Sequence, residues 1–153
     1  MSDSSIILIP EQLGHVPEKS KHDQAVRKFR EVAPEVNAIE VKLTEGIRFI
    51  HCGQNFGGVF CPGCGRELGL SWWQERMDED LPDHETGFKL VPKKLPCCEI
   101  ERTLHQLRYE GTVGFTRFSI EAMNPSIGLL EKARIALFEQ ILDCPLRVIY
   151  CRY

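Results

Sequence analysis

The sequence predicts an α+β fold of a single domain, residues 1–153, in which two β-α-β halves share one sheet. Both ends of the chain show a strand, a helix and a strand in that order. The middle, residues 53–113, is denser in Gly, Pro, Cys and Trp. Two β-α-β halves with right-handed crossovers pack most simply as one antiparallel sheet with both helices on one face, which is the ferredoxin-like plan. The middle segment is then an insertion between the halves.

The first half begins with a short apolar run at residues 6–9, closed by a proline, which predicts a buried strand. A helix follows, and Pro34 ends it. Its apolar positions recur at helical spacing: Ala25, Val26, Phe29, Val32 and Ala33. Residues 38–43 then alternate between apolar and polar side chains, as a strand does. We expect a hairpin turn at residues 44–46 and a return strand at residues 47–52.

The second half opens with alternating residues 114–123, which predict a strand. The Asn-Pro step after it is a helix-entry signal, with Asn124 or Ser126 as the N-cap. An apolar stripe then runs through a helix of about four turns: Leu130, Ala133, Leu137 and Ile141. Pro145 ends this helix, and residues 146–152 form the last strand.

The insertion contains the motif FCPGCG, in which Cys61 and Cys64 stand two residues apart. A proline and glycines shape a tight turn there, and both thiolates of such a turn reach one ion at about 2.3 Å. Zinc is the default ion because it accepts four sulfur ligands tetrahedrally without redox chemistry. The motif therefore predicts half of a Zn²⁺ site in a zinc-ribbon-like subdomain spanning residues 53–113.

The segment LPCCEIE supplies the other two ligands most simply through Cys97 and Cys98. Adjacent residues of an extended strand point to opposite faces, so both bind one ion only if the chain turns. The preceding proline favours a turn. If the chain stays extended, only one of the two binds, and Cys52 or His105 takes the fourth position. Four side chains are therefore held in reserve as ligands: His51, Cys52, His84 and His105.

Two other interpretations of the cysteines carry less weight. A redox CxxC motif normally opens a helix after a strand, and this pattern is not evident around Cys61. A disulfide between the neighbours Cys97 and Cys98 is strained. Two cysteine pairs within one insertion are a stronger metal signal than either pair alone, whereas Cys144 and Cys151 are expected to pack in the core or near the sheet edge.

The segments FIHCGQNFGGVFCPGCGREL, LPCCEIERTLHQLRY and GFTRFSIEAMNP together resemble a family of small, uncharacterised bacterial proteins. Its members share a CPxCG knuckle, a Trp-rich helix, a PCC step and a strand ending in Asn-Pro. The resemblance covers most of the chain, implies Cys61, Cys64, Cys97 and Cys98 as ligands, and brings no known activity. This chain departs from the pattern at Glu99, where the family has a glycine.

Composition and charge narrow the classes of function. The net charge is −3 and no run of Lys or Arg occurs, which disfavours nucleic acid as a partner. The N-terminus has no basic region, and its apolar run is too short for a signal peptide or a membrane span, so we expect a cytoplasmic protein.

The acidic run at residues 78–85 lacks the spacing of a calcium loop and predicts a solvated loop. Two expectations exist for Trp72 and Trp73: both seal the small subdomain, which is favoured, or one is buried and the other is partly exposed and available to a partner.

Two functions of different class follow from the cysteines. Four thiolate ligands close the coordination sphere, which favours a structural site in a binding or regulatory module that contacts a protein partner or itself. A zinc-dependent hydrolase is the alternative, and it requires three protein ligands, a water and a base such as Glu99 or His105. The sequence leaves open whether the protein is an enzyme and favours the first interpretation.

Overall fold

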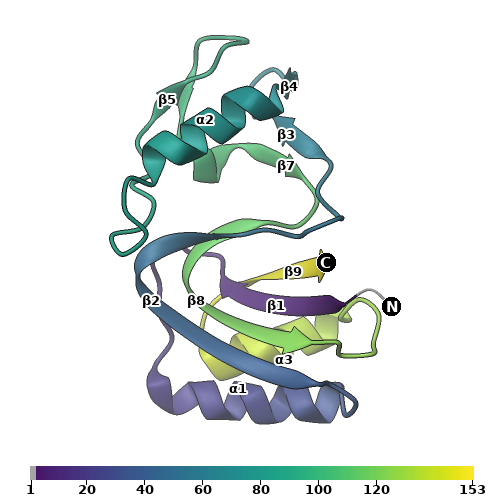
Figure 1. Cartoon of the computed structure of the whole chain (residues 1–153). Helices are drawn as coiled ribbons and strands as arrows, with labels where there is room; N and C mark the ends of the chain where they lie inside the picture. The colour runs from purple at the N-terminus through teal and green to yellow at the C-terminus, as the bar shows by residue number, and fades with distance from the viewer. Residues whose placement is uncertain (1–2) are drawn as a thin grey trace.

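The structure of the protein is a computed structural model that describes residues 3–153 (Figure 1). It is an α+β fold built on a four-stranded antiparallel sheet with the strand order β2-β8-β1-β9. The strands are β1 (Ser4–Pro10), β2 (Ala38–Ile50), β8 (Gly114–Met123) and β9 (Leu146–Arg152). The strands predicted at residues 6–9, 114–123 and 146–152 are confirmed. None of the described helices is long and apolar enough to cross a membrane.

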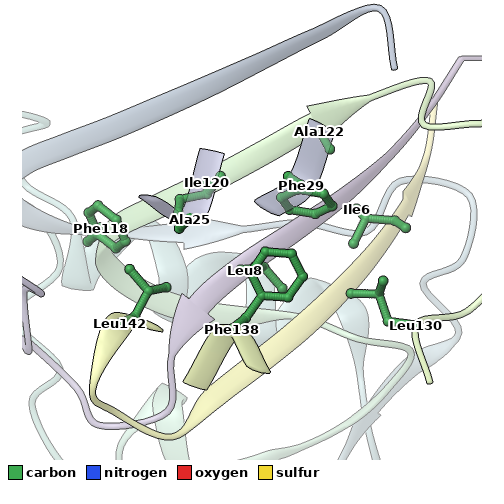
Figure 2. Packing of buried hydrophobic residues seen from close by; sticks show 10 residues of the cluster. All are labelled: Ile6, Leu8, Ala25, Phe29, Phe118, Ile120, Ala122, Leu130, Phe138 and Leu142. Carbon is green, nitrogen blue, oxygen red and sulfur yellow. The ribbon is translucent and has the colours of Figure 1, made fainter. Parts of the chain in front are cut away.

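Two helices, α1 (Lys19–Val32) and α3 (Lys132–Leu142), cover one face of this sheet (Figure 1). The core between them is aromatic and aliphatic, and Figure 2 shows the rings of Phe29 and Phe138 side by side. Their ring centroids lie 4.9 Å apart. The strands contribute the alternate residues of β1 and β8 to this core: Ile6, Leu8, Phe118, Ile120 and Ala122. The helix-facing side of the sheet thus follows from the two-residue period of its strands.

The predicted hairpin at residues 44–46 is wrong, because β2 continues through it as one strand of 13 residues. Leu43 pairs with Phe118 but Arg48 pairs with Thr116, so β2 carries three more residues than β8 across this irregularity. Thr44 holds the bulge, since its hydroxyl donates to the carbonyl of Gly46 at 2.7 Å. Turn-forming residues therefore make a bulge here, because β8 offers a continuous partner on both sides of it.

The predicted start of the second helix is also wrong. Asn124 and Ser126 both have positive φ, and α3 begins only at Lys132, after Glu131 as N-cap. The buried positions of the helix are Phe138 and Leu142, whereas Leu137 is 44% exposed. The predicted stripe is confirmed at Leu130 and Ile141, which pack in or against the core between the helices and the sheet, and wrong at Ala133 and Leu137, which are exposed. Leu137 and Phe138 are adjacent, and the contact of Phe138 with Phe29 of α1 decides which of them faces the sheet.

The insertion lies over the other face of the sheet (Figure 1). It contains a three-stranded sheet, a two-stranded hairpin, a helix and a short 3₁₀ turn. Their bounds are β3 (Gly58–Phe60), β4 (Glu67–Leu68), α2 (Leu70–Asp80), β5 (Lys93–Lys94), β6 (Glu101–Arg102), η1 (Leu104–Gln106) and β7 (Arg108–Glu110). A second core joins the insertion to the sheet through Trp73 of α2 and Phe49 and Phe115 of the sheet. Trp73 is buried in this core and Trp72 packs against it while partly exposed, so both tryptophans contribute to closing the insertion.

The acidic run is not a solvated loop throughout, because Asp80 at the end of α2 is 2% exposed. Its carboxylate accepts hydrogen bonds from the backbone N–H groups of Leu90 (2.7 Å) and Val91 (3.1 Å). It also lies 3.3 Å from the ammonium of Lys93. Asp80 therefore stabilises the segment that leads into β5. The sequence pattern does not distinguish this buried carboxylate from the exposed acidic residues beside it.

Candidate metal centre

The four predicted cysteines come together from two hairpin turns of the insertion. Cys61 and Cys64 lie in the turn between β3 and β4, and Cys97 and Cys98 lie in the turn between β5 and β6. All four Sγ atoms lie within 4.8 Å of one another, a group that can hold a metal ion. The sulfur of Cys98 is 3.4 Å from that of Cys61 and 3.8 Å from that of Cys97.

The two turns share one backbone design. In the first turn, the N–H of Cys61 donates to the carbonyl of Arg66 (2.9 Å), and the carbonyl of Cys61 accepts from the N–H of Gly65 (3.0 Å). In the second turn, the N–H of Leu95 donates to the carbonyl of Ile100 (2.9 Å), and the carbonyl of Leu95 accepts from the N–H of Glu99 (3.2 Å). The fifth residue of each turn has positive φ, 77° at the first and 61° at the second. The segments CPGCG and LPCCE are therefore equivalent turns.

This equivalence shows where the second turn departs from the first. Leu95 stands where the first turn has Cys61, and it is buried in the second core. Cys97 stands where the first turn has Gly63, so a sulfur is supplied from the third position instead of the first. The aligned prolines and fourth-position cysteines of the two segments carry a signal of this repeat, which the sequence analysis missed.

The chain does turn at the adjacent cysteines, which is the condition for both to reach one ion. Residues 96–98 form the turn, and Glu99 takes the left-handed conformation that glycine ordinarily supplies. The backbone reversal removes the opposite-face geometry of an extended strand, so the sulfurs of Cys97 and Cys98 lie 3.8 Å apart.

The four thiols of the cluster do not ionise equally easily, and backbone amides favour the thiolate of Cys61. The Sγ of Cys61 accepts from the N–H groups of Gly63 (3.3 Å) and Cys64 (3.4 Å). These bonds, above all that from Cys64, lower the pKa of the Cys61 thiol to about 6. Burial and the neighbouring sulfurs raise the pKa of Cys97 to about 12, and the contact with Cys61 raises that of Cys98. One thiolate is thus stabilised by the protein itself, and a bound cation would stabilise the others against protonation.

The reserve ligands lie elsewhere, since the group of sulfurs in the described part of the chain comprises the four cysteines and no histidine. Cys52 is fully buried in a separate core with Cys151. The ring of His105 packs edge-on against Phe115, and the ring of His51 accepts a hydrogen bond from the N–H of Gly53. The alternative in which Cys52 or His105 occupies the fourth position therefore has no geometric support.

The cluster is anchored to the second core and not isolated at the surface. Cys61 is 1% exposed and packs with Val59, Leu68, Leu95 and Leu104. The opposite rim is open, because Cys64 is exposed. An ion held by these sulfurs would therefore link two short hairpins to each other and to the buried side chains beneath them.

No family model, curated protein or solved structure matches the chain. The resemblance to small bacterial proteins with CPxCG and PCC motifs consequently stays a prediction that rests on the motifs.

Proposed function

We propose that Cys61, Cys64, Cys97 and Cys98 bind one Zn²⁺ ion and that this ion is structural. The observation that carries the proposal is the mutual approach of the four sulfurs within 4.8 Å. Sulfur ligands at about 2.3 Å from a tetrahedral ion are separated by about 3.8 Å, so only small adjustments of the turns are needed. Zinc is favoured over other ions because a set of four thiolates suits a soft, tetrahedral, redox-inactive cation.

Four protein ligands leave zinc no coordination position for a substrate or an activated water. This supports a structural site over a zinc-dependent hydrolase, which would need one cysteine to release the ion. Glu99 supports the same preference, since its side chain is exposed and lies 3.6 Å from Lys94. We therefore propose a non-catalytic metal site in a small binding or regulatory protein.

The ion would act by stabilising the insertion. The strands β3, β4, β5, β6 and β7 have only two or three residues each, too few to form a stable hairpin alone. We propose that residues 53–113 are a zinc-ribbon-like subdomain inserted into a ferredoxin-like domain. The strand order β2-β8-β1-β9 and the two helices on one face support this assignment.

Metal analysis of purified protein tests the proposal. We expect the wild type to carry one equivalent of zinc, and Cys64→Ser to lose it together with thermal stability. Cys144→Ser is the matched control, because Cys144 lies outside the cluster. The structural role would be contradicted if the zinc-free protein kept the melting temperature of the zinc-loaded wild type. The ligand set would be contradicted if Cys64→Ser kept the zinc content of the wild type.

A further inference from the structure

A pocket of about 590 Å³ lies on the sheet face opposite α1 and α3, within the size range of small-molecule sites. Ile7 of β1 lines it, whereas its neighbours Ile6 and Leu8 face the helices. The loop after α2 reaches the sheet beside the pocket, since the N–H of Phe88 donates to the carbonyl of Ile47 at 2.8 Å. This loop contributes His84 to the wall. The pocket is therefore formed jointly by the main sheet and the insertion.

One end of the pocket is cationic. Arg48 follows the bulge of β2, and its guanidinium donates to the hydroxyls of Thr44 (3.2 Å) and Ser119 (3.0 Å) and to the carbonyl of Lys42 (2.9 Å). These bonds hold the side chain in one position. Among residues 3–153, no carboxylate oxygen lies within 4.0 Å of the charged nitrogens of Arg48 or Lys42. A fixed, half-buried guanidinium of this kind suits a ligand carboxylate.

The other end is anionic. Glu40 of β2 and Glu121 of β8 are direct cross-strand partners, and both line the pocket. One oxygen of Glu121 accepts from the hydroxyls of Ser5 (2.6 Å) and Tyr153 (2.7 Å), whereas Glu40 forms no ion pair with a described residue. Like charges directly opposite each other destabilise a sheet. A cationic group between the two carboxylates would relieve this repulsion.

The spacing of the two ends defines the class of ligand. Ser119, whose hydroxyl accepts a hydrogen bond from Arg48, pairs with Lys42, and the pair Glu40–Glu121 lies two residues further along the same strands, a backbone spacing of about 7 Å. A ligand whose ammonium and carboxylate lie on the same carbon spans this gap with one ion-pair contact at each end. We propose that the pocket binds a free α-amino acid, with its carboxylate on Arg48 and its ammonium between Glu40 and Glu121.

The remaining walls leave room for the amino-acid side chain. His51 lines the pocket, and its Nδ1 accepts from the N–H of Gly53 at 2.8 Å, so the neutral ring carries its proton on Nε2. His84 faces the same space from the insertion. The proposal deepens the binding role proposed above but does not depend on the metal, because none of the four cysteines lines the pocket.

Calorimetric titration of the zinc-loaded protein with each of the common L-amino acids tests the proposal. We expect at least one to bind, and the N-acetyl and carboxamide derivatives of the tightest one to bind about tenfold to hundredfold more weakly. These ligand changes probe both charge contacts on the unaltered protein. The zinc content of the same sample is measured separately, so failure of the metal proposal is distinguishable from failure of this one.

Matched variants locate the site. Glu40→Gln and Arg48→Gln should weaken binding by a similar factor, and Glu45→Gln, an exposed neighbour outside the pocket, should leave it unchanged. Folding of each variant is checked by circular dichroism, and the ligand derivatives decide the outcome if Arg48→Gln does not fold. Absence of binding by every amino acid at millimolar concentration overturns the proposal. So does binding that persists in both derivatives, or a response to inorganic phosphate or Mg²⁺ alone.

Discussion

The main sheet and the insertion reach stability by different means. The main sheet has strands of 7 to 13 residues and a core closed by two helices, in which Phe29 and Phe138 are completely buried. The insertion has strands of two or three residues, and two of its turns bring four cysteine sulfurs together. Both regions bury apolar surface, but in the insertion the proposed metal ion would add a cross-link that the long strands of the main sheet do not require.

Truncation of the main core should have the largest effect. Phe138→Ala removes a fully buried ring and should cost about 3–5 kcal/mol of unfolding free energy, whether or not zinc is bound. Chemical denaturation followed by circular dichroism measures this cost. Leu137→Ala is the matched control, because its side chain is 44% exposed and should change stability by about 0.5 kcal/mol or less. Equal costs for the two variants would contradict the placement of the helix face.

A smaller effect is expected at the buried carboxylate of the insertion. Asp80→Asn removes the charge opposite Lys93 and replaces one acceptor by a donor that faces the N–H of Leu90 or Val91. The loss should be about 1–3 kcal/mol, with zinc still bound. Thermal melting and metal content measure the two quantities, and Asp78→Asn, an exposed neighbour, is the control. A loss of zinc in Asp80→Asn would show that this carboxylate supports the metal turns directly.

The smallest effect should be a gain. Glu99 has φ of 61° in a turn whose counterpart has Gly65 at 77°. Glu99→Gly should remove left-handed strain and stabilise the protein by about 0.5–1 kcal/mol after the entropic cost of glycine. Gly65→Ala should have the opposite sign for the same reason. Melting temperatures of the zinc-loaded variants test both, and a destabilised Glu99→Gly would mean that the contact with Lys94 outweighs the strain.

The candidate cysteines were predictable because the evidence for each pair is local. Pro62 and Gly65 mark a turn, and Pro96 marks the second. Neither the bulge in β2 nor the late start of α3 was predictable in this way. Residues 44–46 and Asn124 carry ordinary turn and cap signals, but long-range pairing of β2 with β8 and of β1 with β8 decides what those signals produce.

The charged residues of the pocket were likewise visible in the sequence, but their common location was not. The alternation of Glu40 and Lys42 on one strand, and of Ser119 and Glu121 on another, was evident from the sequence. The predicted hairpin assigned Arg48 to a separate return strand, so these charges were never brought together. Their common site depends on the register Glu40 to Glu121 and on the continuity of β2 past its bulge.

The sequence by itself determined the strand and helix types of the two halves and singled out the four cysteines that the fold brings together, because each follows from periodicity or from a turn within a few residues. The tertiary structure decided which face of α3 is buried, that β2 is one strand, and that opposite charges meet without pairing in one pocket. These features depend on contacts between residues far apart in the chain. The free energy of each contact is set by the residue that packs or pairs there in the folded protein, and the local sequence pattern does not specify that residue.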